Sequence, residues 1–366
     1  MTSIGEIIVE LEKAAPLSFQ EKYDNCGLLI GNKDEIISNI LVCLDCTEYI
    51  IDEAISKKCN LIISHHPLIF NGIKKLTGDT YIEKTILKAI KNDIAIYAIH
   101  TNLDNVLLKG VNSKIAEKLN LSNLRILLPK SEKLAKLVTF APIEFAEKIR
   151  QTLFETGAGH ISNYSNCSFN TEGLGTFKGN DLSHPFVGKA NELHLELETK
   201  IETIFPLYLK NEIISALLTI HPYEEVAYDI IKLENEWHSL GSGMVGELQM
   251  EMSQSEFLKF LKSNLNLEVI KFTSINKPIN KIALCGGSGS FLLSKAIQAK
   301  ADVFITSDFK YHEFFDAEGS IMICDVGHYE SEQFTSELII EIIRDKFANF
   351  APILAETNTN PVNYYY

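Results

Sequence analysis

Apolar and polar positions alternate in blocks along the first 127 residues. Three apolar runs are rich in Ile, Leu and Val, which is typical of strands buried on both faces: 36–44, 61–64 and 94–99. Four other segments carry apolar side chains at helical spacing, the second with Thr47 as a candidate N-cap: 5–13, 47–58, 80–91 and 110–119. Strands that alternate with helices predict βαβ units and a mainly parallel sheet.

The chain contains an internal repeat. Residues 40–66 align without a gap onto residues 282–308, at a constant offset of 242, so that Cys43 falls on Cys285 and Ser64 on Thr306. A similar apolar pattern can arise by convergence, but identities at turn positions favour a duplicated strand-helix-strand module. The second copy continues with a predicted helix over 311–317, a strand over 320–325 and one long helix from about 328 to 347.

The segment between the two copies has a different pattern. Residues 193–197 alternate in strand fashion, glycines are frequent, and two helices are predicted over 144–156 and 207–221. The order strand-helix-strand-strand-helix-strand suits a ferredoxin-like plait. The predicted fold is therefore α/β, with a duplicated, mainly parallel sheet and flanking helices, split by an inserted ferredoxin-like α+β domain. The expected domains are 1–127 and 239–366, the two halves of one domain, and the insertion 128–238.

Composition limits the functional classes. The chain has 366 residues, enough for two or three domains, and 46% hydrophobic content, enough for a large core. Its net charge is −14, which argues against nonspecific binding to nucleic acid or to an anionic membrane. No run is apolar and long enough to span a bilayer, and the N-terminus lacks secretory features. Seven scattered cysteines indicate reduced thiols, so we expect a cytoplasmic protein.

Three predicted strands end in histidine or carboxylate side chains. The first is followed by His65 and His66, which taken alone read equally well as ligands or as one core and one surface histidine. The other two ends carry pairs with the same spacing, His100 with Asp104 and His328 with Glu332. Ligands bind beyond the carboxyl ends of parallel strands, and the joint occurrence at three ends is improbable by accident. We therefore expect one shared site at the rim of a single sheet.

The side chains at these strand ends are imidazoles and carboxylates without a thiolate. Such a set suits Zn, Fe(II), Mn or Co. Five or six ligands are too many for one tetrahedral zinc and suit two metal ions, bridged by Glu332 or Asp104 and by a water molecule. A water held by two metals ionises near neutral pH, so hydrolysis is the expected chemistry.

Other residues fall near the same strand ends. The turn Gly286–Gly289 either offers backbone amides to a phosphate or allows tight packing of a strand against a helix. Asp308 and His312 lie at and beyond the repeat position of His66. They are either outer partners that orient the metal ligands or simply a polar strand end.

Several motifs, in this order, resemble a known family. ISHHP, HTNLDN, CGGSG, TSDFKYHE and GHYESE are similar to motifs of the NIF-three-like dinuclear-metal proteins, often called GTP cyclohydrolase 1 type 2 homologues. YDNCGLLIG resembles the N-terminal motif of that family, with Tyr23 where a tryptophan is usual. The middle segment, with CSFNTEGLGTF and HPYEEVAYDI, resembles the PII- or CutA-like insertion of the longer members. The resemblance covers nearly the whole chain.

The resemblance implies a metal site and an assembly. It implies two divalent ions per chain on five ligands: His65, His66, Asp104, His328 and Glu332. His100 then takes a nearby role, in proton transfer or in orienting ligands. The family also implies a toroidal homohexamer with its metal sites facing an internal cavity.

Two functional classes are compatible with these expectations. One is a metal-dependent hydrolase that acts on a nucleotide or related heterocycle. The other is a metal-binding chaperone or regulatory protein without turnover, whose inserted domain senses a small molecule. A DNA-binding regulator is disfavoured by the net charge of −14.

Overall fold

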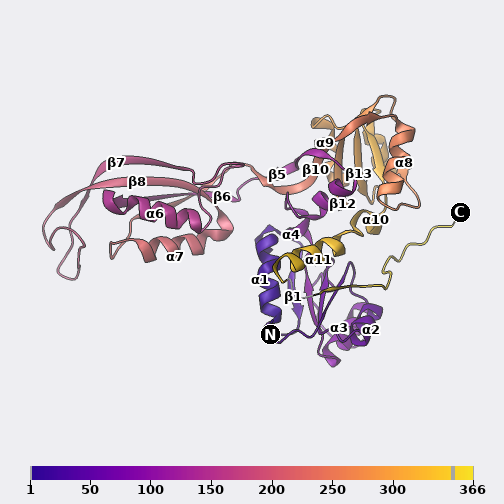
Figure 1. Ribbon diagram of the computed structural model, residues 1–366, viewed down its shortest axis with the longest axis horizontal. Coiled ribbons are helices and arrows are strands. Elements are labelled where there is room, and N and C mark those ends of the chain that lie inside the picture. Colours follow the sequence, from indigo (N-terminus) through magenta and orange to yellow (C-terminus); the bar gives the residue numbers. More distant parts are fainter. Residues whose placement is uncertain (1, 348–350, 366) are drawn as a thin grey trace. The chain divides into compact units, whose positions relative to one another are not determined.

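The computed structural model describes residues 2–347 and 351–365, and the chain divides into two compact units (Figure 1). One unit, here called the split unit, combines the chain up to Pro129 with the chain from Ser239 onward. The other, the inserted unit, is Lys130–His238. Within the described residues, no helix combines the length and apolar character needed to cross a membrane.

The first half of the split unit contains the predicted alternation of strands and helices. Its elements are α1 (Ile4–Ala14), η1 (Leu17–Phe19), β1 (Gly27–Ile30), β2 (Ile40–Cys43), α2 (Glu48–Ser56), β3 (Leu61–Ser64), α3 (Tyr81–Lys91), β4 (Ala95–Ala98), α4 (Thr101–Asp104), α5 (Val111–Lys118) and β5 (Ser122–Lys130). Ser3 begins α1 with a capping box. Thr80 caps α3 through its side chain, whereas Thr47 stands at the N-cap of α2 without a side-chain hydrogen bond. Thr47 is therefore the N-cap residue of α2, as expected, but its side chain does not bond the first turn.

The second half repeats this alternation after a long strand. Its elements are β10 (Trp237–Met252), α8 (Gln254–Asn264), β11 (Lys271–Phe272), β12 (Ile279–Ser288), η3 (Ser290–Leu292), α9 (Leu293–Gln298), β13 (Val303–Ser307), η4 (Tyr311–Ala317), β14 (Met322–Asp325), α10 (His328–Glu332), α11 (Thr335–Lys346) and β15 (Ile353–Leu354). The two halves therefore share a strand-helix-strand core, in agreement with the mixed α/β class expected from the sequence.

Strand pairing in the two halves has the same register at the offset of 242 residues. Strands β2 and β3 are parallel, with Leu41 opposite Ile62, and β12 and β13 are parallel, with Ala283 opposite Phe304. In each half these positions belong to the core between the sheet and its helix, α2 in the first half and α9 in the second. The sequence repeat therefore corresponds to two equivalent layers of strand and helix.

The two halves form two separate sheets, which corrects the expectation of a single one. The first sheet has the strand order β1-β4-β3-β2-β15, and the second has β11-β14-β13-β12-β10-β5. Each has parallel central strands and at least one antiparallel strand at an edge. The chain forms strands β1 to β4 of the first sheet before it repeats the module in a second sheet, so sequence duplication does not imply one continuous sheet. After the second sheet, α11 returns to pack on α1 and β2, and β15 adds to the first sheet (Figure 1).

The inserted unit is an antiparallel sheet covered by two helices. Its elements are β6 (Leu134–Pro142), α6 (Ile143–Glu155), β7 (Ser168–Phe177), β8 (His194–Pro206), η2 (Leu207–Leu209), α7 (Lys210–Ile220) and β9 (Tyr228–Leu233), with the strand order β7-β8-β6-β9. Strand β6 pairs with both β8 and β9 in antiparallel register. Ile201 and Phe205 alternate inward along β8 and pack with Ile149 of α6 and Ile213 of α7. This unit has its own hydrophobic core.

Candidate metal centre

The site lies where three strands of the split unit end. Strand β3 is followed directly by His65 and His66, and β4 is followed by His100 and the short helix α4, which ends at Asp104. Strand β14, in the second sheet, is followed by α10, which begins at His328 and ends at Glu332. All six predicted strand-end side chains therefore come from carboxyl ends of parallel strands, but from two sheets.

Four imidazole rings gather at this point. The centroid of the His66 ring lies 4.9 Å from that of His65, 5.3 Å from that of His100 and 5.3 Å from that of His328. The rings of His65 and His100 are 5.2 Å apart. The structure thus brings His328, which is more than 260 residues away in the sequence, beside the two adjacent histidines.

Each of these imidazoles is held through its Nδ1 atom by an oxygen. The pairs are His65 with the carbonyl of Ile99 at 2.8 Å, His66 with Asp45 at 2.7 Å, His100 with Asp24 at 2.8 Å, and His328 with Asp308 at 2.6 Å. An acceptor at Nδ1 favours a proton on that nitrogen and leaves the Nε2 lone pair available to a metal. This is the arrangement that metal-ligating histidines show in proteins.

Glu332 reaches the imidazoles with both of its carboxylate oxygens. Its Oε2 lies 2.9 Å from Nε2 of His66 and 3.2 Å from Nε2 of His328, and its Oε1 lies 3.9 Å from Nε2 of His65. The side chain is only 3% exposed. A carboxylate that presents one oxygen to each side is suited to bridge two cations.

Two polar atoms in the cluster are buried without a hydrogen-bond partner. They are Nε2 of His65 and Oδ1 of Asp104, and they lie 3.6 Å apart. Leaving a buried polar group unpaired costs about 1–3 kcal/mol, more for a charged group, so such an arrangement needs a reason. A cation that is bound by both atoms would remove the cost, and this is the observation by which the residues fit a metal ion.

The ligand atoms fall into overlapping groups of three, each with all its atoms within 4.8 Å of one another. These groups are His65, Asp104 and Glu332; His66, His328 and Glu332; and His65, His66 and His100. The first two share Glu332, and together they contain all five expected ligands. These histidine and carboxylate groups could hold metal.

Burial and the neighbouring ionisable groups shift the pKa values of several side chains in the cluster. Burial raises the pKa of Asp104. Burial would raise the pKa of Glu332 as well, but hydrogen bonds from His328 and His66 outweigh it and hold that pKa well below its ordinary value. Burial would lower the pKa of His66, but its bonds with Asp45 and Glu332 raise it to about 10. With this pKa the His66 imidazole carries a proton on Nε2 as well as on Nδ1 near neutral pH. A metal ion bound at Nε2 would displace the Nε2 proton, so metal binding would release protons.

The sequence matches the family model described as Duf34/NIF3 (NGG1p interacting factor 3) over residues 2–361. The chain belongs to the Duf34/NIF3 family. Relatives called GTP cyclohydrolase 1 type 2 homolog are 38% identical in Bacillus subtilis, over 98% of both chains, and 37% identical in Staphylococcus epidermidis, over 99% of both.

Solved structures agree with this membership. A Bacillus cereus protein related to NIF3 superposes with a TM-score of 0.87 at 37% identity, over 100% of this chain and 99% of that one. A Staphylococcus aureus protein superposes with a TM-score of 0.79 at 31% identity, over 100% of this chain and 99% of that one. The resemblance inferred from the motifs is therefore confirmed.

The predicted long helix from 328 to 347 is broken, and the break lies next to the site. In this Duf34/NIF3 chain α10 ends at Glu332 and α11 begins at Thr335. The side-chain amide of Gln333 donates to the carbonyls of Glu330 and Leu265. In a continuous helix the Glu330 carbonyl would instead accept from the amide of residue 334. No proline or glycine occurs in 328–347, so the sequence carries no local signal of the break.

Two amides of the glycine turn are already occupied within the protein. The amide of Gly286 donates to Asn112, and that of Gly287 donates to Ser331. Gly287 has φ +62°, and a β-carbon there would overlap Oε1 of Glu332. The turn therefore allows close packing against the Glu332 carboxylate, in line with the second of the two readings of this motif.

The structure places the predicted outer partners differently from one another. Asp308 accepts from Nδ1 of His328. His312 is exposed and lies against the rings of Tyr311 and Phe315. His100 belongs to the imidazole cluster itself and shares a group of three with His65 and His66.

Two carboxylates at the site were not predicted from the sequence. Asp45, which orients His66, follows the buried strand β2 by two residues, so the strand-end criterion could have found it. Asp24, which orients His100, has a fully buried side chain that also accepts from the amide and hydroxyl of Thr101. It lies in the YDNCG motif, where an aspartate is also expected simply as a turn residue.

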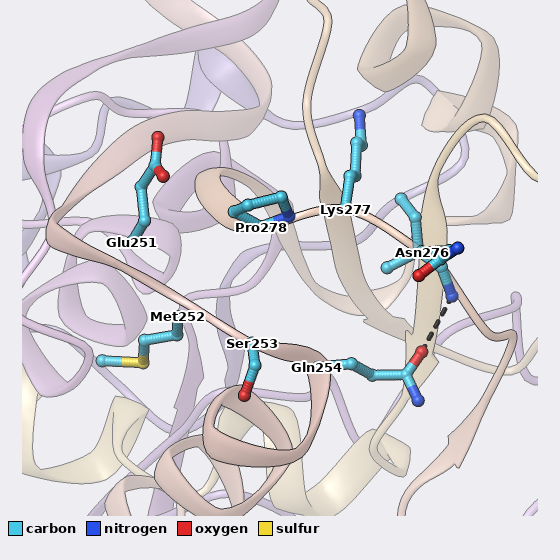
Figure 2. A pocket seen from close by; sticks show the side chains of 8 residues that line it. Glu251, Met252, Ser253, Gln254, Asn276, Lys277 and Pro278 are labelled. Atoms are coloured by element: carbon cyan, nitrogen blue, oxygen red, sulfur yellow. Dashed lines mark hydrogen bonds between the residues drawn. The ribbon is translucent and has the colours of Figure 1, made fainter.

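The open pocket in Figure 2 is a separate feature of the second half. It has a volume of about 530 Å³ and is lined by the end of β10, the start of α8 and residues 275–278. The side chain of Gln254 accepts the amide of Ile275 at 2.8 Å across it. None of the candidate metal ligands lines this pocket.

Proposed function

We propose that this protein is a metal-dependent hydrolase with two divalent metal ions, Zn, Fe or Mn, acting on a nucleotide or a related heterocycle. The observation that carries the proposal is the buried, unpaired pair of ligand atoms on His65 and Asp104, beside a carboxylate that also faces His66 and His328. One position would be held by His65, Asp104 and Glu332, and the other by His66, His328 and Glu332. Two such ions, when bound, supply a hydroxide nucleophile near neutral pH.

The chain's own residues fix this chemistry in place. Nδ1 contacts orient each imidazole, and the buried Glu332 faces Nε2 of His66. His100 is the candidate for proton transfer, since Asp24 holds its Nδ1 and its ring faces His65 and His66. Burial would raise the pKa of Asp24, but bonds from His100 and Thr101 lower it strongly, so Asp24 is an ionised acceptor.

Aromatic rings beside His100 support a planar substrate. The Phe70 ring lies 6.3 Å from that of His100 and 6.2 Å from that of Tyr23. Phe70 is 42% exposed and Tyr23 65% exposed. A flat apolar surface next to a metal site can stack a heterocyclic base. Tyr23→Ala should raise KM for such a substrate more than it lowers kcat.

The test is turnover of a panel of nucleotides, GTP first, with Mn²⁺, Fe²⁺ or Zn²⁺. Wild type is compared with Glu332→Gln and with the matched control Glu337→Gln. Glu337 lies on α11 and forms an ion pair with Lys118 of α5. We expect product with wild type and with Glu337→Gln, and none with Glu332→Gln. Tight nucleotide or metal binding without product would reject the hydrolase and favour the chaperone or regulatory class.

The inserted unit and the assembly belong to the same proposal. The order β6, α6, β7, β8, α7, β9 with sheet order β7-β8-β6-β9 supports a ferredoxin-like domain. The homohexamer stays a prediction. Light scattering of the purified protein, which measures the molar mass of the assembly, tests it.

A further inference from the structure

The C-terminal segment runs toward the support of one metal ligand. Strand β15 is parallel to β2, with Ile353 opposite Leu41, and the amide of Ala355 donates to the carbonyl of Val42 at 2.9 Å. Because the strands are parallel, the chain leaves β15 in the direction in which β2 leads to Asp45. The segment 355–365 that follows is here called the tail.

The tail is fixed to the first half by two kinds of contact. The backbone amides of Glu356 and Thr357 donate to the carboxylate of Glu53 on α2, at 2.8 and 3.0 Å. Two residues later, the hydroxyl of Thr359 donates to Oδ2 of Asp45 at 3.0 Å. The other oxygen of Asp45 holds Nδ1 of His66 at 2.7 Å. Thr359 is therefore two hydrogen bonds from a candidate ligand.

The tail also holds the helix that carries the other two ligands of that position. The side-chain amide of Asn360 and the hydroxyl of Tyr364 donate to Oε1 of Glu330, at 3.0 and 3.2 Å. Glu330 is only 9% exposed, and on α10 it lies two residues from both His328 and Glu332. The tail thus joins the supports of His66 to the helix that carries His328.

The two ligands that belong to the other position alone, His65 and Asp104, are supported from within the first half. The carbonyl of Ile99 holds His65, and the side-chain amide of Asn112 donates to the carbonyl of Asp104 at 3.0 Å. Ile99 and Asn112 are both buried. The two positions therefore differ in the origin of their supports.

We propose that the tail is a positioning element for one of the two metal positions, that of His66, His328 and Glu332. Thr359 fixes Asp45, and Asn360 with Tyr364 fixes α10, so that the two imidazole nitrogens converge on the shared carboxylate. Detaching the tail then weakens this position and leaves that of His65 and Asp104 in place. This inference rests on the proposed dinuclear site.

The test is a Zn²⁺ titration of the metal-free full chain against a chromophoric chelator. Thr359→Val removes the hydroxyl at nearly the same size, Thr359→Ser keeps it, and Tyr365→Ala changes a fully exposed tail residue. Loss of a residue that orients a metal ligand typically weakens metal affinity about 10–100-fold. Thr359 acts through Asp45, so we expect a smaller loss than this, confined to one of the two Zn²⁺, in Thr359→Val. The other two variants should keep wild-type affinities.

A second variant tests the same position from the other side. Asn360→Ala with Tyr364→Phe releases Glu330 and should weaken the same Zn²⁺, which anomalous scattering locates beside His66. Wild-type affinities in both altered tails, or an equal loss of both metals, would overturn the proposal. A wild-type protein that binds no Zn²⁺ would instead reject the proposed function. If wild type binds two Zn²⁺ and the altered tails do too with unchanged affinity, only the role of the tail is rejected.

Discussion

The two halves of the split unit share one strand register but carry different residues at the rim. At the offset of 242, the candidate ligand His66 corresponds to Asp308, which holds Nδ1 of the candidate ligand His328. Asp45, which orients His66, corresponds to Gly287, which leaves room for Glu332. The first half therefore supplies three of the five candidate ligands, and the second supplies His328, the shared carboxylate of Glu332 and the space that this carboxylate needs.

This difference shows how one backbone layer can serve unequal chemical roles. The apolar positions that build each layer are equivalent, as with Leu41 and Ala283. The residues beyond the strand ends differ in chemical character between the halves, and side chains there can change without loss of core packing. Each substitution below separates a role in the metal site from a role in the fold.

The largest effect is expected for Glu332→Ala. The change removes the one carboxylate that both groups of three share, so both metal positions should lose affinity. Metal content of the purified protein, measured by mass spectrometry, should fall from about two ions per chain to below one. Glu337→Gln should keep the wild-type content, and a Glu332→Ala variant that retains both metals would contradict the shared bridge.

Gly287→Ala should lose metal as well as stability. A methyl group at φ +62° costs about 1–2 kcal/mol, and here it also displaces the carboxylate of Glu332. Gly319→Ala is the matched control, because Gly319 has φ +67° and no atom within 4 Å of the added carbon. Chemical denaturation should show a similar backbone cost in both variants. Equal metal content in the two would show that the glycine serves only the turn.

Asp45→Asn and Asp308→Asn compare the orienting carboxylates of the two halves. Each holds the Nδ1 of one imidazole, His66 or His328, and both imidazoles belong to the same group of three. Each change should weaken one metal about 10–100-fold and spare the other. Zn²⁺ titration measures both affinities, and loss of different metals in the two variants would break the assignment.

The smallest effect is a pH dependence at Glu53, which anchors the tail. Burial would raise the pKa of Glu53, but bonds from Lys57, Thr357 and backbone amides lower it from 4.5 to about 2. A lowered pKa stabilises the folded state above pH 4.5, and this stabilisation is lost as the pH falls toward 2. The stability difference between wild type and Glu53→Gln should therefore shrink over that range in urea titrations. A constant difference would contradict the shift.

Many strands of the fold could be predicted from local sequence pattern, but the contacts between segments that are distant in the sequence could not. Apolar runs located β2, β3 and β4, and the repeat located β12 and β13, because buried strands have a local sequence signature. The pairing of β15 with β2 and the break after Glu332 depend on contacts between distant segments. Periodicity therefore predicted one sheet for the split unit, which has two, and one long helix where the structure has α10 and α11.

The candidate site follows the same division. His65, His66, Asp104, His328 and Glu332 were found because each follows a strand end or shares a helix face with such a residue. Thr359 and Asp24 were not, since a hydroxyl in an extended tail and an acid in a turn have no distinctive spacing. Their roles depend on tertiary contacts with Asp45 and His100.

The most direct test of the account is anomalous scattering from crystals grown with Zn²⁺. The account predicts two peaks per chain about 3.5–4 Å apart, on either side of the Glu332 carboxylate, one beside His65 and Asp104 and the other beside His66 and His328. Zn²⁺ bound elsewhere, or crystals of saturated protein without a peak at Glu332, would contradict it.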